Sequence, residues 1–493
     1  MALGAAATTT KGFWSTWSYN ANNVGAISRK KQRAPTTENS TGEQLLPQFE
    51  NEKEAIESTT KFKARSGVRE LNDSSTGNFF TAEIVAEHNT VDDCWIIIND
   101  KVYDVTQFGK DHPGGPVIFT QAGRDGTDYF RVFHSAKAWT YLQEYYIGDL
   151  KNVEPMSDVL SEYRELRRVL LKAQLFKSSK FYYFYKSLGN LAILAASLWI
   201  ISAYDSFLSV LSSAFLLGLF WQQCGWLSHD FLHHQVTEDR WLNTMIGGLF
   251  WGNFMQGYSV GWWKTKHNVH HAATNECDEK FNPVDPDIDT VPLLAWSKDI
   301  LATVDNEFFR SIIRIQHILF FPLLFLARFS WLHSSWEHAR LYDMSKAMRI
   351  LERGCLVLHY VALVAIAFSC LPVRMAISWL FLSQLSCGGL LSIVFVLSHN
   401  GMDVYNDPRD FVRAQVTSTR NIEGNFFNDW FTGGLNRQIE HHLFPTLPRH
   451  NLKKVAPYVK ALCQKHGIHY EELSLWTGIC RVFMRLVEVA QAV

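Results

Sequence analysis

The chain has 493 residues, with 47 lysines and arginines against 48 acidic residues and a formal net charge of −1. This balance excludes a global electrostatic preference for nucleic acid, and no nucleic-acid partner is expected. The length allows two or three domains, and 34 Phe, 17 Trp and 17 Tyr point to apolar segments that an average composition hides. Eight cysteines are scattered without a C-x-x-C pair, which fits a reducing compartment.

The N-terminal part predicts a disordered tail followed by a small folded domain. Residues 1–75 contain "TTENSTGEQ" and "NDSSTGN" and show no apolar period, which is typical of disorder. They faintly resemble an organelle transit peptide, but they lack the apolar core of a secretory signal. Residues 76–152 have the composition of a soluble domain, with "CWIIINDKVYDV" alternating like paired strands. Residues 153–186 are expected to form a linker and a pre-membrane helix.

Apolar runs later in the chain predict about four transmembrane helices. Each has about the length that a hydrocarbon core requires, and only helices satisfy their own backbone in so short an apolar segment. The four runs are residues 187–203, 206–224, 351–371 and 376–398. Lysines precede the first span but not the turn after it, so its N-terminal side is expected to be cytosolic. These lysines are Lys172, Lys177, Lys180 and Lys186.

Two further apolar pieces, residues 246–263 and 315–332, are long enough to span or to lie in the interface. If either one alone crossed, the histidine clusters before and after it would face opposite sides of the membrane. If the clusters form one site, both pieces are expected to lie flat or to be buried without crossing.

The small domain carries two histidines that predict a haem site. His112 lies in a Pro-Gly-Gly turn, whose glycines permit close approach to a flat ligand, and His134 follows 22 residues later. Two axial histidines would leave no open position, so such a haem would transfer electrons and not bind oxygen. From Trp95 and "KVYDVTQF" through "HPGG" and "FHS" to "YYIGDL", the segment resembles cytochrome b5. The resemblance implies a non-covalent haem b with His112 and His134 as axial ligands and Pro113, Gly114 and Gly115 beside it.

Three polar clusters near the apolar runs predict a metal centre. They read "HDFLHH", "HNVHH" and "QIEHH", with donors at helical i, i+3 or i+4 spacing that places them on one face. Intramembrane and juxtamembrane histidines are costly without a role. Zinc has no redox chemistry, so an electron-carrier domain in the same chain favours iron, with copper as the weaker alternative. Two irons would share about eight or nine nitrogen ligands. The candidate catalytic and metal-binding residues are His229, His233, His234, His267, His270, His271, His441 and His442.

A cytochrome b5 domain ahead of these three clusters resembles the front-end fatty acyl desaturases, over about residues 80–475. "GYSVGWWKTKHNVHH", "DPDIDTVPLLAWS" and "QIEHHLFPTLPRHNL" look most like members acting at the Δ6 position. The resemblance implies a multidomain fold: a small α+β haem domain, then an all-α membrane desaturase domain over residues 187–475 and a C-terminal tail over 476–493. It also implies insertion of a cis double bond using O2, two non-haem irons and electrons relayed through the haem domain.

The implied partners are a fatty acyl lipid or acyl-CoA substrate, cytochrome b5 reductase and the lipid bilayer. The implied location is the endoplasmic reticulum membrane, with the haem domain and the histidine clusters cytosolic. His399, at the end of the last span, resembles a further ligand, and Gln438 is a weaker donor at the head of the third cluster. The choice between His233 and His234 stays open.

Several alternatives remain at this stage. Δ5 or Δ8 acyl desaturases, a sphingoid-base Δ8 desaturase and an acyl hydroxylase use similar clusters, and a non-catalytic membrane-anchored haem carrier is more remote. Asp285, Asp287 and Asp289 lack full calcium-loop spacing and are expected in a solvated or capping loop. His359, in the middle of a span, is expected to be a hydrogen-bonded packing residue.

Overall fold

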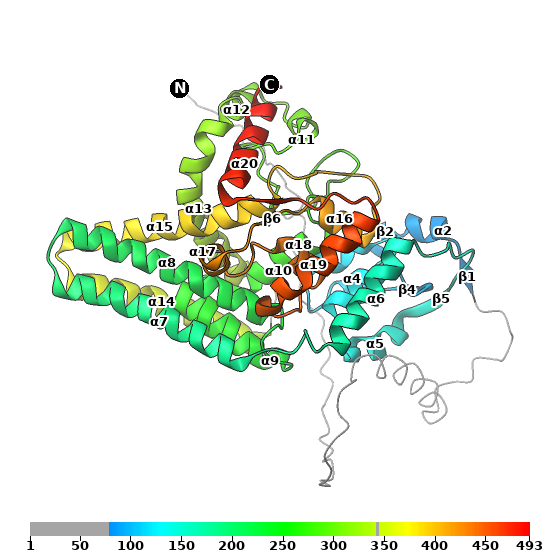
Figure 1. The fold of residues 1–493 in the computed structure, drawn as a ribbon, viewed down its shortest axis with the longest axis horizontal. Helices are drawn as coiled ribbons and strands as arrows, with labels where there is room; N and C mark the ends of the chain where they lie inside the picture. The colour runs from blue at the N-terminus through cyan, green and yellow to red at the C-terminus, as the bar shows by residue number, and fades with distance from the viewer. Residues whose placement is uncertain (1–77, 342–344) are drawn as a thin grey trace, which may run out of the picture. The chain divides into compact units, whose positions relative to one another are not determined.

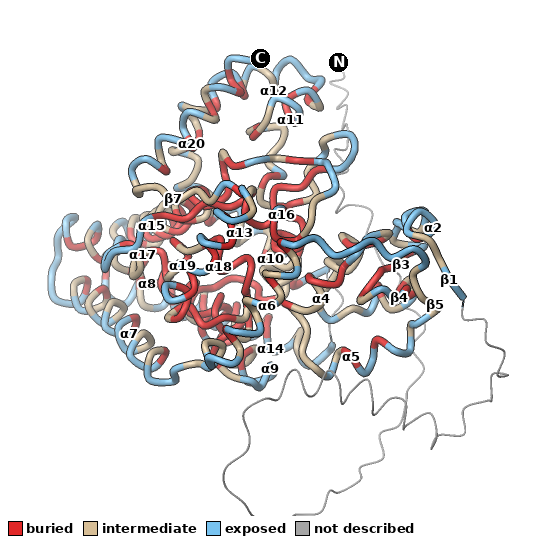
Figure 2. Tube along the Cα trace, turned by 45° about the vertical axis from the view of Figure 1, so that its right-hand side comes forward, coloured by how far each residue is buried: buried red, intermediate tan, exposed pale blue. Residues whose placement is uncertain are grey.

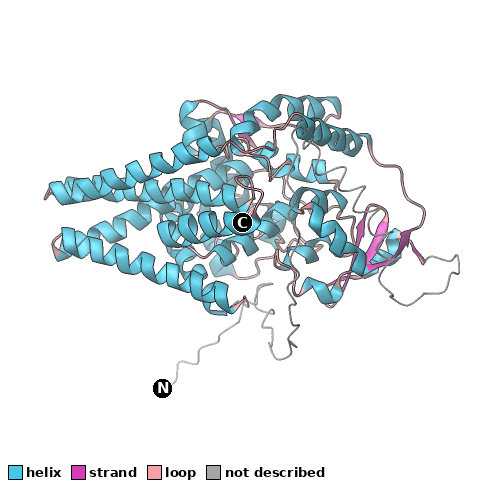
Figure 3. Cartoon of the chain, turned by 90° about the horizontal axis from the view of Figure 1, so that it is seen from below, coloured by secondary structure: helices cyan, strands magenta, loops and turns pink. Residues whose placement is uncertain are grey.

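The computed structural model describes residues 78–341 and 345–493 (Figure 1). The predicted tail, residues 1–75, lies outside the described residues. Figure 3 shows the strands of one sheet gathered in a single region, while most of the remaining described chain is helical.

The small domain is built on a five-stranded sheet with the strand order β1-β5-β4-β3-β2. Its members are β1 (Phe79–Phe80), β2 (Asn89–Thr90), β3 (Asp93–Ile98), β4 (Lys101–Asp104) and β5 (Tyr146–Leu150). The β3–β4 hairpin turns through Asn99 and Asp100, which both have positive φ, as a two-residue hairpin loop of the favoured twist requires. Alternation along β3 buries Ile96 and Ile98 in the domain core.

Short helices cover the sheet and form the two walls that carry the candidate haem histidines. They are α2 (Ala82–Glu87), α3 (Thr106–Gly109), η2 (Pro116–Gln121), α4 (Thr127–Phe133), α5 (Ala136–Leu142) and η3 (Gln143–Tyr145). His112 lies in the turn between α3 and η2, and His134 caps the C-terminal end of α4. This arrangement is the α+β haem-domain fold predicted from the sequence.

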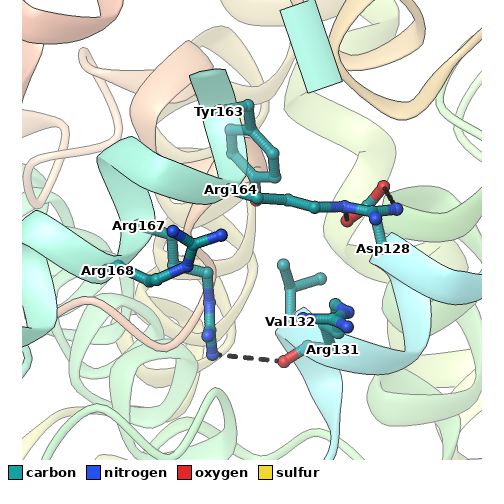
Figure 4. Close-up of a pocket in the computed structure, with 7 residues that line it drawn as sticks. All are labelled: Asp128, Arg131, Val132, Tyr163, Arg164, Arg167 and Arg168. Carbon is teal, nitrogen blue, oxygen red and sulfur yellow. Dashed lines mark hydrogen bonds and ion pairs between the residues drawn. The ribbon is translucent and has the colours of Figure 1, made fainter. Parts of the chain in front are cut away.

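Helix α6 (Asp158–Lys172) joins the small domain to the rest of the chain. Arg164 makes two hydrogen bonds of 2.8 Å to the Asp128 carboxylate on α4, and Arg167 donates to the backbone oxygen of Arg131 (Figure 4). On its other side, the buried Tyr163 hydroxyl donates to the backbone oxygen of Leu443. Helix α6 therefore contacts both the helix that ends at His134 and the segment that contains His441 and His442.

Among the described residues, five helices are long and apolar enough to cross a membrane, judged by length and composition. They are α7 (Lys180–Ala203), α8 (Phe207–Leu232), α13 (Gln316–Leu341), α14 (Lys346–Cys370) and α15 (Val373–His399). In Figure 1, α7, α8, α14 and α15 run along a common direction, and they contain the four predicted spans. Helix α13 runs in another direction and packs tightly on α15, since a Cβ on Gly388 would lie 2.4 Å from the Phe325 oxygen.

The two ambiguous apolar pieces have different structures. Residues 246–263 fall mainly in a π-helix, η4 (Thr244–Gln256), between α9 (Arg240–Asn243) and α10 (Val260–Ala272). Residues 315–332 form most of α13, which is among the five candidate spans. The expected number of about four is therefore close to the observed five, and the non-crossing of the two pieces stays a prediction.

The remaining elements surround the centre of the helical domain. They are α11 (Lys298–Ala302), α12 (Glu307–Ile313), α16 (Phe411–Thr417), β6 (Asn421–Ile422), α17 (Phe426–Phe431), α18 (Gln438–Leu443), α19 (Arg449–Lys465), β7 (Glu472–Leu473) and α20 (Leu475–Ala490). Figure 2 shows buried chain concentrated around α10, α18 and α19. The expected tail, residues 476–493, is instead mostly α20: its apolar face, including Val482 and Leu486, is fully buried among residues of α13 and α15.

Candidate metal centres

The two histidines of the small domain face each other across a gap suited to an axially ligated haem. The ring centroids of His112 and His134 are 5.8 Å apart. The Nδ1 atom of His112 lies 3.1 Å from the backbone oxygen of Gly115, and that of His134 lies 3.1 Å from the oxygen of Phe130. An Nδ1–H donated to each carbonyl leaves both Nε2 atoms free to bind a metal.

The surroundings of this pair also fit a flat apolar ligand. Burial lowers the pKa of His112, and burial together with the neighbouring His112 lowers the pKa of His134 to about 3, so both rings are neutral donors. Phe130 stacks on His134 at a centroid distance of 4.3 Å. Gly115 has a φ of +79°, and a Cβ on Gly114 would lie 2.7 Å from the His112 ring, so side chains are excluded there.

A five-histidine cluster forms where α8, α10 and α18 meet. One ring nitrogen from each of its members lies within 4.8 Å of every other. The Nε2 atom of His267 lies 2.8 Å from that of His233 and 3.0 Å from that of His271, and His441 Nε2 lies 3.2 Å from His271 Nε2. The members, all buried, are His229, His233, His267, His271 and His441.

A three-histidine cluster lies beside it and consists of His270, His399 and His442, all buried. Each of these rings has an acceptor at Nδ1, which leaves Nε2 for a metal. His270 Nδ1 is 3.0 Å from Asp285 Oδ2, His399 Nδ1 is 3.2 Å from the Ser418 oxygen, and His442 Nδ1 is 2.8 Å from Gln415 Oε1. The stacked rings of His271 and His442, 4.1 Å apart, connect the two clusters.

The electrostatics of the five-histidine cluster favour neutral imidazole ligands. Burial, reinforced by the neighbouring histidines, lowers the pKa of His233, His267, His271 and His441 well below its usual range. His229 Nε2 is buried without a hydrogen-bond partner among the described residues. Buried ring nitrogens that carry no proton and point toward one another destabilise the fold unless a cation binds between them. The residues of each cluster therefore fit one metal ion.

Gln438 lies at the three-histidine cluster. Its Nε2 is 3.1 Å from His399 Nε2 and 3.4 Å from His442 Nε2, while its Oε1 is buried and has no hydrogen-bond partner in the part of the chain that the structure describes. Because the two amide atoms are assigned only from their hydrogen bonds, a rotated amide would direct Oε1 at the same place. Gln438, the first residue of the "QIEHH" motif, could therefore act as a fourth donor beside His270, His399 and His442.

The structure also identifies supporting residues that the sequence did not single out. Asp285, expected in a solvated or capping loop, is fully buried, so the expectation of a solvated side chain was wrong; its carboxylate caps backbone N–H groups and also faces His270 Nδ1. Asp230 Oδ1 lies 3.3 Å from His229 Nδ1, and Gln415 faces His442. Asp285 lies in a loop 15 residues after His270, and no sequence motif relates a loop carboxylate to a histidine at that distance. Of these supporting residues, only Asp230 could have been found from the sequence, because it directly follows His229 in the first cluster.

His234 lies outside both clusters among the described residues. Helix α8 ends at Leu232, and His234 has a left-handed φ of +58° that turns its ring toward Asn243, 3.4 Å away. The structure therefore brings His233, and not His234, into the five-histidine cluster. The packing role expected for His359 agrees with its buried ring and its 2.8 Å contact from Nδ1 to the Phe254 oxygen.

The candidate haem site and the five-histidine cluster meet at Phe133. Phe133, which directly precedes His134, contacts the His271 ring edge-on at a centroid distance of 6.0 Å. Arg240 donates to the Phe133 backbone oxygen at 3.0 Å, and Asn268 donates to the Gly114 oxygen at 3.0 Å. Arg124 forms an ion pair with Glu276. Both histidine-bearing walls of the small domain therefore contact the α9–α10 region of the helical domain.

Comparison with known proteins gives the same two-part organisation. The family model for fatty acid desaturases matches residues 205–474, and the model for the cytochrome b5-like heme/steroid binding domain matches residues 81–151. An acyl-lipid (9-3)-desaturase of Physcomitrium patens is 55% identical over 408 residues, covering 83% of this chain and 78% of that protein.

Two further relatives are more distant. The Delta(8)-fatty-acid desaturase 2 of Arabidopsis thaliana is 34% identical, covering 82% of this chain and 91% of that protein. The Delta(6)-fatty-acid desaturase fat-3 of Caenorhabditis elegans is 33% identical, covering 81% and 96%. These matches confirm the resemblance predicted from the haem-domain motifs and the three histidine clusters. The chain belongs to the fatty acid desaturase family and is a front-end desaturase in which a cytochrome b5-like domain is fused to the desaturase domain.

Proposed function

We propose that this protein is an O2-dependent Δ6 desaturase that inserts a cis double bond into polyunsaturated fatty acyl chains. The observation that carries the proposal is the convergence of eight buried histidines, in groups of five and three, directly beside a second pair of histidines suited to haem. The Δ6 position is supported by the sequence around the second and third clusters and by a relative named for that position.

Each centre has its own ligands in this proposal. His112 and His134 would hold a haem b, and the five-histidine cluster and the three-histidine cluster with Gln438 would each hold one iron. When bound, the haem would supply single electrons, and the iron pair would supply the oxygen chemistry needed to remove hydrogen from an unactivated C–H bond. Asp285, Gln415 and the Ser418 oxygen keep the Nδ1 protons away from the metal side of the rings.

The chain's own residues place the haem domain against the iron ligands. Phe133, which directly precedes His134, contacts the His271 ring edge-on, and Arg240 donates a hydrogen bond to the Phe133 backbone oxygen. The Arg124–Glu276 pair and Tyr129, whose ring packs edge-on against Phe411 at 4.9 Å, add contacts at the same interface. This arrangement supports electron delivery within one chain.

The protein is also expected to need a membrane, an electron source and an acyl carrier. The long apolar helices and the family indicate a multi-pass membrane protein. We propose the endoplasmic reticulum membrane, with the haem domain and the clusters on the cytosolic side, cytochrome b5 reductase as the electron source and an acyl lipid or acyl-CoA as substrate. The lysine excess before α7 supports the orientation.

Expression in a host without such enzymes, fed individual unsaturated fatty acids, tests the regiochemistry. The expected products carry a new cis double bond at Δ6, read by mass spectrometry. New bonds only at Δ5 or Δ8, or in sphingoid bases, would replace the Δ6 proposal with the corresponding alternative, of which Δ8 is favoured by a named relative. A hydroxylated product would identify an acyl hydroxylase.

His441→Ala tests the role of the clusters in the same host. Loss of unsaturated product with an intact haem spectrum and reduced iron content is expected, because His441 contributes to the five-histidine cluster alone. His112→Ala should lose the haem spectrum while the iron content stays. His466→Ala, on α19's C-terminal cap and away from both clusters, is the matched histidine control. Full activity in His441→Ala would contradict the assignment.

A further inference from the structure

A cavity of about 610 Å³ lies between the start of α7, the end of α17, the loop that leads to α18 and the start of α19. Its size is within the range of small-molecule sites. None of the eleven residues assigned above to haem or iron lines it. The cavity is therefore separate from the metal centres and belongs to a part of the chain that the proposed chemistry has not used.

The charge of the cavity wall is strongly positive. Four basic side chains line it, Lys186, Arg437, Arg449 and Lys453, against one acidic side chain, Asp429. Asp429 already accepts a hydrogen bond from Asn436 Nδ2 at 2.8 Å. No ion pair of Lys186 or Lys453 is found among the described residues, and the Lys186 ammonium lies 5.6 Å from the ring centroids of Tyr182 and Tyr185. Two cations are thus available to an anionic ligand.

The rest of the wall is apolar or carries single polar groups. Tyr182, Tyr185, Ile193 and Trp430 supply aromatic and aliphatic surface. Asn190 is 4% exposed, and its side chain faces the Cys224 thiol, but its Nδ2 has no oxygen or nitrogen acceptor within the described chain. A buried amide donor of this kind matches a carbonyl oxygen of a ligand. The wall therefore suits a molecule with an anionic end, an ester-like carbonyl and an apolar part.

The cavity is close to both metal clusters through two arginines. Arg449 Nε lies 2.6 Å from Asp230 Oδ2, and Asp230 in turn faces His229 of the five-histidine cluster. Arg437 directly precedes Gln438 and caps the N-terminal end of α18. A ligand that contacts Arg449 is therefore linked through Asp230 to His229 of the five-histidine cluster. A ligand that contacts Arg437 lies next in sequence to Gln438, which is beside the three-histidine cluster.

We propose that this cavity binds the phosphate-bearing end of the acyl carrier, whether a phospholipid head group or coenzyme A. The inference rests on the proposed function, because a front-end desaturase counts carbons from the carboxyl end and must hold that end near the iron ligands. Lys186 and Lys453 bind the phosphate, and Asn190 donates to the ester or thioester carbonyl.

Equilibrium binding to the full haem- and iron-loaded chain in detergent tests the proposal with two probes, a short-chain phosphatidylcholine and an acyl-coenzyme A. Lys186→Gln combined with Lys453→Gln is expected to weaken binding of the natural carrier by about tenfold for each lysine, the effect of one lost charge-assisted hydrogen bond. A loss confined to phosphatidylcholine identifies an acyl-lipid substrate, a loss confined to acyl-coenzyme A identifies a thioester, and a loss for both identifies general phosphate recognition.

Matched variants separate this effect from a change in folding. Lys454→Gln removes the neighbouring lysine on α19, which does not line the cavity, and should bind both probes normally. Lys186→Arg with Lys453→Arg should keep the affinity, and an uncharged fatty alcohol should bind all variants equally. The single variant Lys453→Gln removes an exposed side chain and cannot disturb the core.

The outcomes distinguish this inference from the proposed function. Unchanged affinity for both probes in the double variant, with a normal haem spectrum, would overturn the cavity assignment even if the unmodified chain makes Δ6 products. Equal weakening by Lys454→Gln would overturn it as well. If lysine-dependent carrier binding is found but the unmodified chain makes no new double bond, the cavity assignment stands and the proposed function fails.

Discussion

Replacing Asp285 by asparagine should weaken iron binding at the three-histidine cluster. Its carboxylate is fully buried, faces His270 Nδ1 at 3.0 and 3.1 Å, and accepts the backbone N–H groups of Asn275 at 2.8 Å and Asp287 at 2.9 Å. Burial alone would lower the pKa of His270, but the charges of Asp285 and Asp287 raise it above its usual value. Asp285 is thus the group that fixes the ring and increases its basicity.

The expected magnitude follows from these contacts. Loss of a hydrogen-bonded partner behind a metal ligand costs about 10- to 100-fold in metal affinity. Asparagine has the same shape as aspartate, but its amide nitrogen must face either the Asn275 N–H or the Asp287 N–H. One buried donor therefore loses its acceptor, and the free energy of unfolding should fall by about 1–3 kcal/mol.

The assay starts from purified protein that retains haem but has been depleted of non-haem iron. Iron is titrated back, the bound non-haem iron is counted per haem, and activity is measured in parallel. Asp289→Asn is the control, because Asp289 is an exposed residue of the same loop. The haem spectrum should be unchanged in both variants, since the proposed haem ligands His112 and His134 lie in the other domain. Wild-type iron affinity in a folded Asp285→Asn protein would refute the assignment of Asp285 as the group behind His270.

Three further predictions follow from the same geometry. Arg124→Glu should slow reoxidation of the reduced haem by at least several-fold in a stopped-flow experiment, and Glu276→Arg in the same chain should restore the rate, because the pair bridges the domains; no rescue would contradict the docking. Phe133→Leu should slow the same step while the haem spectrum stays normal, whereas Phe427→Leu, an exposed aromatic on α17, should not. His234→Ala should bind two irons, measured by metal counting, and loss of one iron would contradict its exclusion from the clusters.

The sequence predicted the order of the haem and desaturase domains and most of the histidines that the fold brings together, because both depend on local patterns. The "HPGG" turn, the length of the apolar runs and the i, i+3, i+4 spacing each follow from a few consecutive residues. The role of Asp285 could not be predicted in this way, because its contact with His270 depends on the path of a loop. The C-terminal segment was missed for a related reason: α20 has only one apolar face, and its burial depends on where α13 and α15 lie.

Helical spacing explains how three similar motifs build two unequal clusters. On α10, His267 and His271 are four residues apart and face the five-histidine cluster, while His270 faces the other cluster. On α18 the same spacing is used with the opposite outcome, since Gln438 and His442 face the three-histidine cluster and His441 faces the five-histidine cluster.

Gln438 is therefore not a weakened copy of His267, although it has the same place in its motif. Its amide lies beside His399 and His442, at a cluster with three histidines among the described residues. An amide oxygen is a weaker donor than imidazole, so as a fourth ligand it would hold a metal ion less firmly than a histidine would. If this difference matters, Gln438→His should raise iron affinity at the three-histidine cluster while lowering turnover, and Gln438→Leu should lower both. Equal turnover in Gln438→His and the unmodified chain would show that the amide serves only to fill its place.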